Sequence, residues 1–277
     1  MKYILNFLLL LLFCSFSISA QTDTYNGWID KSAKFIENNR LDSAAVALQK
    51  AMRLDPANKN NAVLLLNLGI LQRQLRQTDD AYISFTASLG NNPDPVLVLH
   101  NRASLLCDLG RFDEAMEDYN SIIDKQPLDV EAYYRRGLLF LEKNDRESAE
   151  ADFRTCESTD PGNLFTKLSK ALIFKLDDNW TEAEKIYTDI INTTVKPSSA
   201  YYLNRAECYV NTDRFSKAAA DLHAVESDEK ANPYFYVLRG RLRLDQFDKF
   251  AARVDFEKAK ELGYDAELAD KWIERAR

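Results

Sequence analysis

The side chains that most often carry catalysis are few in this sequence and widely separated. Its 277 residues include two histidines, His100 and His223, which fall on different predicted helices. A histidine-based triad or a zinc site needs several such groups at one point, and this spacing favours neither. The eight glycines are scattered, so no glycine-rich loop is present to hold a phosphate. We therefore predict no catalytic residue, no metal site and no cofactor.

The thiols offer little more chemistry. Cys107, Cys156 and Cys208 follow an N-terminal apolar segment that contains the fourth cysteine, Cys14. No two of them have the Cys-x-x-Cys spacing of redox or zinc sites. Cys156 and Cys208 fall on the predicted inward faces of helices, where small buried thiols are more usual than a disulfide. A disulfide is the alternative.

The elements that carry these residues are predicted helices that come in pairs. Within Val130–Asn163, Tyr133, Gly137 and Phe140 are spaced i, i+4 and i+7, so they share one face of a first helix. The same spacing recurs on a second helix at Ala149, Phe153 and Cys156. Gly137 and Ala149 are small where the two helices would cross, which lets their backbones approach.

Turn residues separate the two helices of the pair. Asn144 tolerates the left-handed conformation that ends a helix, and Asn39 and Gly110 take the same place in other copies. Pro161 closes the second helix because it cannot continue one. The segment is therefore predicted to be an antiparallel helix pair.

The pattern recurs along the chain with a period of about 34 residues. The place of Gly137 is taken by Gly69, Ala103, Ala171, Ala206 and Gly240. The predicted copies are residues 25–58, 62–95, 96–129, 130–163, 164–197, 199–232 and 233–266. One pair cannot bury its apolar face alone, so neighbouring pairs are expected to stack.

This combination of an aromatic residue, a small pair and a terminal proline resembles the tetratricopeptide repeat, and Trp28 supplies the aromatic residue of the first copy. The resemblance extends from Tyr25 to Ala266. It implies an all-α fold, a right-handed superhelical α-solenoid of about seven helix-turn-helix repeats that forms one domain, residues 21–277. Residues 267–277 are predicted to be a C-terminal capping helix.

Polar residues near the start of the predicted second helices are expected to cap them. Such side chains accept hydrogen bonds from the free N–H groups of a first turn. The predicted caps are Asp42, Asp79, Asp113, Thr181 and Ser216.

An arginine on the first helix and an aspartate on the second occur together in four copies and are both missing from the other three. The pairs are Arg102 with Asp118, Arg136 with Asp152, Arg205 with Asp221 and Arg239 with Asp255. This pattern favours structural ion pairs. An anion-binding ladder of arginines is the alternative, although neutralised arginines leave little charge for a ligand.

The resemblance implies that partners bind along a concave wall formed by the first helices. Amide groups can donate to and accept from an extended peptide backbone, and tyrosine and arginine are frequent interface anchors. The predicted partner-binding residues are Asn67, His100, Asn101, Tyr134, Arg135, Leu138, Asn204 and Glu207. The alternative is that some of them contact neighbouring first helices instead.

Residues 1–20 are predicted to be a secretory signal peptide. Lys2 precedes an apolar run from Ile4 to Phe13, and a serine-rich segment follows. This run is too short for a comfortable membrane span, and no other segment is long enough. An uncleaved anchor is one alternative. A lipoprotein modified at Cys14 is another, although Phe13 stands where a small residue is expected.

We expect a secreted or periplasmic protein that does not span the membrane after signal cleavage. Its formal net charge of −7 at pH 7 is poorly suited to phosphate backbones, so no nucleic-acid partner is expected. The predicted function is that of a non-catalytic scaffold that binds a protein or peptide in its groove, with no small-molecule substrate. The alternatives are a structural subunit of an envelope assembly, held by flank or end-to-end contacts, and an enzyme with a site between repeats.

Overall fold

The computed structural model describes residues 23–277, and the regular elements in that range are all helices. The predicted all-α fold is therefore confirmed over this range. The described residues form two compact units, 23–155 and 156–277, which we call the N-terminal unit and the C-terminal unit. The predicted signal peptide, residues 1–20, lies outside the described residues.

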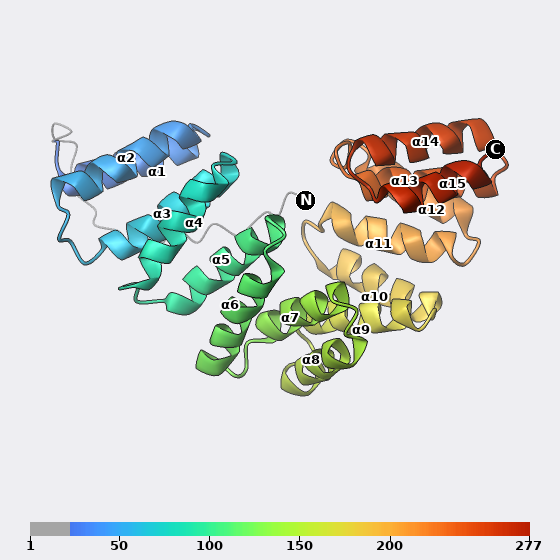
Figure 1. Ribbon diagram of the computed structural model, residues 1–277, viewed down its shortest axis with the longest axis horizontal. Helices are drawn as coiled ribbons and strands as arrows, with labels where there is room; N and C mark the ends of the chain where they lie inside the picture. Colours follow the sequence, from blue (N-terminus) through green and yellow to red (C-terminus); the bar gives the residue numbers. More distant parts are fainter. Residues whose placement is uncertain (1–22) are drawn as a thin grey trace. The chain divides into compact units, whose positions relative to one another are not determined.

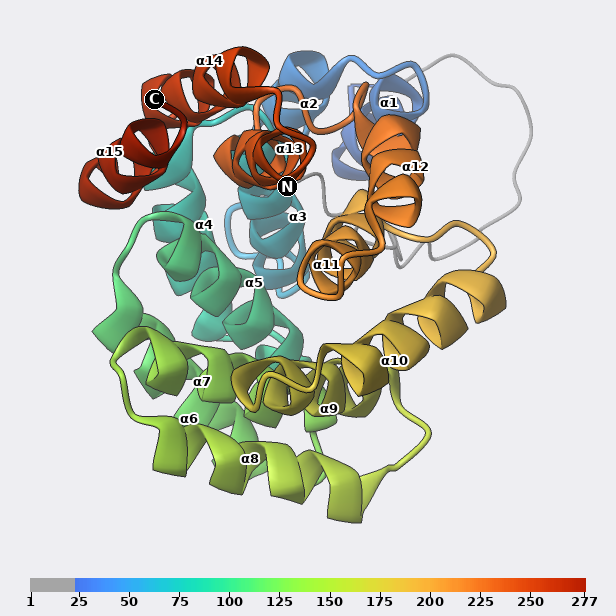
Figure 2. The same cartoon turned by 90° about the vertical axis from the view of Figure 1, so that its right-hand side faces the viewer.

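The N-terminal unit consists of helical hairpins that follow one another in sequence order (Figure 1). Its helices are α1 (Tyr25–Glu37), α2 (Leu41–Leu54), α3 (Asn61–Gln74), α4 (Thr78–Leu89), α5 (Pro95–Asp108), α6 (Phe112–Lys125) and α7 (Val130–Glu142). Each hairpin packs on the next, so that α2 contacts α3, α4 contacts α5 and α6 contacts α7 (Figure 2). The next helix, α8 (Arg146–Thr159), contains the boundary between the units.

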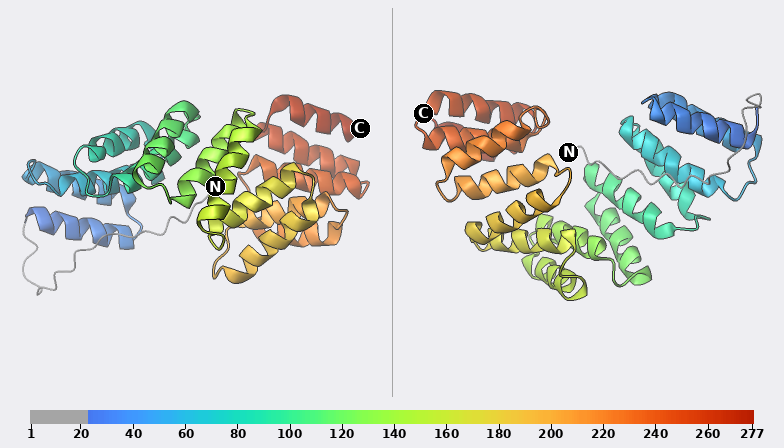
Figure 3. Two further views of the ribbon diagram at one scale, coloured as in Figure 1. Left: turned by 90° about the horizontal axis from the view of Figure 1, so that it is seen from below. Right: turned by 180° about the vertical axis from the view of Figure 1, so that it is seen from behind.

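The C-terminal unit repeats this arrangement (Figure 3). Its helices are α9 (Leu164–Leu176), α10 (Trp180–Thr193), α11 (Ser199–Val210), α12 (Phe215–Val225), α13 (Pro233–Asp245), α14 (Lys249–Glu261) and α15 (Ala266–Arg275). Trp272 of α15 stacks on Phe256 of α14, with ring centroids 5.6 Å apart, while Leu268 is half exposed. Trp272 therefore covers the apolar flank of the last hairpin.

Small residues line the helix crossings, as the sequence predicted. The alanine of the second helix has no exposed surface in any copy, at Ala44, Ala81, Ala115, Ala149, Ala183, Ala218 and Ala252. A larger side chain at these positions would push the two helices apart, because helix axes that pack closely are only about 8–10 Å apart.

The predicted caps of the second helices are wrong by two residues. The N-caps are Arg40, Gln77, Arg111, Asn179 and Arg214. The Arg40 carbonyl already accepts from the N–H of Ala44, so α2 begins directly after the turn and Asp42 lies inside its first turn. A carboxylate there still favours the helix, because it faces the positive end of the helix dipole.

The turn inside each hairpin uses the left-handed conformation that the sequence predicted. Asn39, Gly110 and Asn144 have φ values of 55°, 71° and 59°. The other copies place Arg76, Asp178, Asp213 and Phe247 at this position, all with positive φ.

Candidate functional site

The predicted wall residues lie in both units. Six of them are on α3, α5 and α7 of the N-terminal unit, and Asn204 and Glu207 are on α11 of the C-terminal unit. We call the first group the N-terminal surface, which consists of Asn67, His100, Asn101, Tyr134, Arg135 and Leu138.

Two asparagines of the N-terminal surface keep hydrogen-bonding capacity. Asn67 is half-buried on α3 and makes no hydrogen bond to any described residue. Asn101 is only 6% exposed, and its amide nitrogen donates to the carbonyl of Leu97 at 2.8 Å. No donor among the described residues reaches the Asn101 Oδ1. Both side chains can therefore accept from a ligand.

His100 connects α5 to the start of α7. Its Nε2 lies 2.9 Å from Oδ2 of Asp129, the N-cap of α7, which also accepts from the N–H of Ala132 at 2.8 Å. Burial raises the pKa of the Asp129 carboxyl, but these hydrogen bonds outweigh it and hold the pKa below its usual range. His100 therefore holds two first helices in register.

The three α7 residues of the N-terminal surface are half-buried. Arg135 donates from Nε to Oε1 of Glu131 at 2.6 Å. The ring of Tyr134 lies 6.2 Å from that of Phe153, which is buried in the crossing of α7 and α8. Leu138 follows Tyr134 by one helical turn, so the apolar surface continues along α7.

Sequence reasoning missed a polar bridge between α3 and α5. Arg73 donates to Oδ2 of Asp108 through Nε at 3.0 Å and Nη2 at 2.5 Å, and Nη2 also lies 2.9 Å from Oγ of Ser104. Arg73 and Asp108 are separated by one repeat period plus one residue, which is the signal that could have revealed the pair. The bridge holds α3 beside α5 at one end of the N-terminal surface.

In the C-terminal unit, the predicted wall residues are engaged by their neighbours. Asn204 donates to the carbonyl of Ala200 at 2.8 Å, while its Oδ1 accepts from Nζ of Lys175 at 2.7 Å and from the hydroxyl of Tyr187 at 3.3 Å. Glu207 forms an ion pair with the same Lys175 at 2.5 Å. These two side chains connect α11 to α9 and α10.

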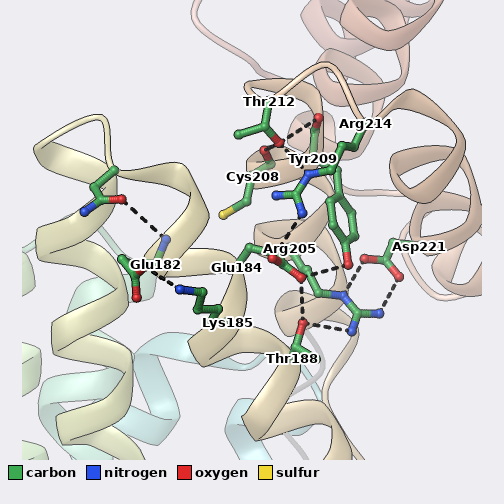
Figure 4. A network of polar contacts seen from close by, with 11 residues as sticks. Glu182, Glu184, Lys185, Thr188, Arg205, Cys208, Tyr209, Thr212, Arg214 and Asp221 are labelled. Carbon is green, nitrogen blue, oxygen red and sulfur yellow. Dashed lines mark hydrogen bonds and ion pairs between the residues drawn. The ribbon is translucent and has the colours of Figure 1, made fainter.

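A second polar network of the C-terminal unit is centred on Glu184 (Figure 4). Glu184 of α10 accepts from the hydroxyls of Tyr209 and Thr188 at 3.1 and 3.2 Å and from Nη1 of Arg214 at 3.2 Å. Burial raises the pKa of the Glu184 carboxyl, but these hydrogen bonds outweigh it and lower the pKa overall. The network holds α10 to α11 and to the turn before α12.

The predicted arginine–aspartate ion pairs are confirmed. Each arginine donates twice to the buried aspartate of its own second helix, with shortest distances of 2.6 Å for Arg102–Asp118, 2.7 Å for Arg136–Asp152, 2.6 Å for Arg205–Asp221 and 2.8 Å for Arg239–Asp255. Arg136 also donates from Nη1 to Oδ1 of Asn120 on the preceding second helix at 2.7 Å. The hydrogen bonds that Arg136 donates to Asp152 raise the pKa of the Arg136 guanidinium. These guanidinium groups connect helices and are poorly placed to bind an anion.

No disulfide joins the described cysteines to one another, as the sequence predicted. Cys156 and Cys208 are buried and Cys107 is half-buried. Burial raises the pKa of the Cys208 thiol to about 12 and also raises that of Cys107. Thiols with raised pKa values are poor nucleophiles at neutral pH, because the thiolate is the reactive form.

Residues 23–277 meet the requirements of neither a metal site nor a membrane-spanning helix. The acidic, histidine and cysteine side chains in this range form no group of three or more that could hold a metal ion. No helix in the same range combines the length and apolar character needed to cross a bilayer.

Stacked helical hairpins with a small residue at each crossing define an α-solenoid, the class of protein that presents helix faces to other chains. The chain belongs to the tetratricopeptide repeat family. It is similar to a tetratricopeptide repeat protein from Parabacteroides merdae of known crystal structure, with 33% identity and a TM-score of 0.70 over 92% of this chain and 99% of that one. A tetratricopeptide repeat family model also matches residues 100–163.

Curated relatives share shorter or weaker similarity. The human protein O-mannosyl-transferase TMTC3 is 30% identical over 50% of this chain, and DnaJ homolog subfamily C member 3 from Gallus gallus is 24% identical over 73% of it. The matches cover 16% and 46% of the lengths of these two relatives.

Proposed function

We propose that this protein is a non-catalytic scaffold whose N-terminal surface binds an extended segment of a protein partner. Tetratricopeptide repeat proteins bind other proteins, and their scaffold is typically non-catalytic, so the proposal concerns the surface used and the form of the partner.

The comparison between equivalent asparagines carries this proposal. Asn67, Asn101 and Asn204 take the same place in three copies. The Oδ1 of Asn204 already accepts from Lys175 and Tyr187. Asn67 makes no hydrogen bond to a described residue, and the Asn101 Oδ1 has no donor among them. The N–H groups of an extended backbone, which recur at regular spacing, can donate to the Oδ1 atoms of Asn67 and Asn101 on adjacent first helices.

The other groups of the N-terminal surface favour a peptide over a small molecule. Tyr134 and Leu138 supply half-buried apolar area, and Leu97 on α5 adds a side chain that is 39% exposed. The Arg135–Glu131 and Arg73–Asp108 pairs place both signs of charge around this area. Mixed charge around apolar anchors is typical of protein interfaces, in which tyrosine and arginine contribute strongly.

Selection of binders from a library of random peptides, followed by affinity measurement on purified variants, tests the proposal. Asn67→Ala should lower the affinity for the selected peptides. It should leave the midpoint of thermal unfolding unchanged, because Asn67 has no hydrogen bond to a described residue. Tyr134→Ala combined with Arg135→Glu should abolish capture while helix content is retained. Asn204→Ala is the matched control, which should lower stability and leave affinity intact. Equal affinity across all variants would exclude the N-terminal surface.

We also propose that the protein is exported from the cytoplasm. A secretory signal at residues 1–20 would place the scaffold in the periplasm or outside the cell, so its partner would be an envelope or secreted protein. Mass spectrometry of the protein purified from its native cells tests this point. Loss of about the first 20 residues is expected, whereas a retained N-terminus would support the uncleaved anchor.

A further inference from the structure

Two phenylalanines of the last repeat depart from the pattern of the other copies. Phe247 takes the turn position at φ 65° and is 90% exposed. Phe250, near the start of α14, is 81% exposed. The other copies place polar side chains at the Phe250 position, namely Asp42, Asp79, Asp113, Glu147, Thr181 and Ser216. Val254, one turn further along α14, is 47% exposed and extends the apolar surface.

Folding of the isolated chain does not explain these residues. The left-handed conformation of Phe247 is strained for a bulky side chain, and exposed aromatic rings gain nothing from the core. Contiguous exposed apolar side chains of this kind mark interaction sites. We call Phe247, Phe250 and Val254 the knob.

The N-terminal unit contains a hollow that could receive such a knob. Its volume is about 380 Å³, and it is lined by Trp28, Phe35, Asp42, Ser43, Val46 and Lys50 of α1 and α2. Trp28 and Phe35 are half-buried aromatic side chains, and Val46 is 49% exposed. The lining therefore combines apolar side chains, two of them aromatic, with polar and charged ones.

The hollow lies on a face of the first copy that no described helix covers. Trp28 and Phe35 correspond in the repeat pattern to Leu99 and Leu106 of the third copy. Those two leucines are buried in a core cluster with side chains of the preceding second helix, α4. Among the described residues, no helix precedes α1, so the same face of the first copy lacks this cover.

Lysines lie beside the hollow and aspartates beside the knob, together with Asp23 and Asp42 at the hollow and Lys249 at the knob. The ammonium groups of Lys31 and Lys50 lie 3.8 and 4.3 Å from the centroid of the Trp28 ring. Phe247 is flanked by the exposed carboxylates of Asp245 and Asp248. Aromatic rings meeting aromatic walls, with carboxylates beside ammonium groups, would bury apolar area and pair charge at once.

We propose that the knob of one copy docks in the hollow of a second copy, so that the chain associates head to tail. A contact between two different surfaces of the same chain is heterologous and leaves a free knob and a free hollow at the ends of each oligomer. Asp245 and Asp248 balance Lys249 and Arg253, so the knob has no excess of positive charge that would attract an anionic lipid surface. This proposal is independent of the N-terminal surface, because it uses neither α3, α5 nor α7.

Sedimentation velocity of the purified protein over a concentration series tests the contact. Oligomers should grow with concentration. Phe247→Asn combined with Phe250→Asp, which restores residues found in other copies, should weaken association by roughly 30-fold or more, the scale of a lost aromatic hot spot. Ile83→Asp is the matched control, since Ile83 is 63% exposed on α4 and belongs to neither surface. It should leave association unchanged.

Mixing two blocked variants distinguishes this contact from a symmetric dimer. The knob double variant keeps its hollow, and Val46→Asp keeps its knob, so each alone should be monomeric. Their mixture should form a one-to-one dimer and nothing larger. Monomeric wild-type protein at every concentration, failure of the mixture to pair, or equal weakening by Ile83→Asp would overturn the proposal. So would monomeric protein that binds anionic phospholipid vesicles through Phe250.

Discussion

The ring of Phe153 occupies the space that a side chain at Gly137 would need. A β-carbon added to Gly137 would lie 2.3 Å from Cε1 of that ring, well inside van der Waals contact. The same relationship joins Gly69 to Phe85 and Gly240 to Phe256, each at 2.6 Å. Copies with alanine or serine at the first position carry leucine or tyrosine at the second, as in Ala206 with Leu222 and Ala103 with Tyr119. In the three Gly–Phe copies the two positions therefore share one volume, and the smaller Leu222 beside Ala206 fits the same rule, whereas Tyr119 keeps a full ring beside Ala103.

Gly137→Ala should destabilise the protein by about 1–3 kcal/mol, because the ring of Phe153 must move in a packed core. The intrinsic helix preference of alanine favours the variant by about 1 kcal/mol, so the clash must exceed this gain. Urea unfolding followed by circular dichroism measures the difference.

The matched control is Gly90→Ala, where an added β-carbon meets nothing closer than 3.7 Å. It should be neutral or slightly stabilising. Adding Phe153→Leu to Gly137→Ala reproduces the Ala206–Leu222 combination and should recover part of the loss, which a double-mutant cycle detects as coupling. Strict additivity would show that the two positions do not share a volume.

Asp152→Ala should destabilise the protein by about 3 kcal/mol, because it leaves the guanidinium of Arg136 partly buried without its bidentate partner. Asp152 is 5% exposed and accepts from Arg136 at 2.9 and 2.7 Å. Thermal and urea unfolding give the free energy.

The exposed pair Arg253–Glu257 provides the comparison for this prediction. Glu257→Ala should change the free energy of unfolding by no more than about 0.5 kcal/mol. Replacing both Arg136 and Asp152 by apolar residues should be milder than Asp152→Ala alone. A double replacement that is no milder would contradict the view that an unpaired charge causes the loss.

Local patterns were enough to predict the hairpins, because they depend on side-chain size and turn chemistry within one repeat. The residue types alone indicate these roles, because Gly137 and Ala149 are small at the helix crossing and Asn144 tolerates positive φ in the turn. The caps were misplaced because a turn with positive φ allows the next helix to begin at once, so Arg40 caps α2 through its backbone while Asp42 supplies only charge.

The candidate site was harder to predict, because the side chains at equivalent positions differ in their neighbours. Asn67 and Asn204 have the same place in the repeat, but Lys175 reaches Asn204 while no described side chain bonds to Asn67. That difference depends on a residue one repeat away. The exposure of Phe250 was also not predicted, because a phenylalanine near the start of a helix is usually assigned to the core unless the other copies are compared.

Acid should weaken the C-terminal unit through Glu184. Its carboxyl has a lowered pKa in the folded protein, where its hydrogen bonds outweigh burial. In the unfolded chain a glutamate carboxyl titrates at about pH 4.3, which is above the pKa of Glu184 in the folded protein. Below about pH 4.3 the unfolded chain therefore binds the proton more readily. The stability that Glu184 contributes above that pH is lost as the pH falls through the folded pKa. Glu184→Gln should make this acid-side loss shallower, as measured by urea unfolding at stepped pH. Identical slopes for Glu184→Gln and the wild type would refute the assignment.

Phe247→Asn should stabilise the monomer while weakening its self-association. A left-handed backbone costs an ordinary L-residue about 1–2 kcal/mol, and asparagine tolerates it better, so a gain of about 1 kcal/mol is expected. The side chain is 90% exposed, so its removal leaves no cavity. Urea unfolding at protein concentrations too low for association measures the gain.

Asn144→Phe makes the reverse change at the same turn position, where φ is 59°, and should lose a similar amount of stability. If both variants unfold like wild type, the turn carries no strain. If Phe247→Asn is more stable and no less associated, the strain is real but Phe247 does not contribute to the contact between copies.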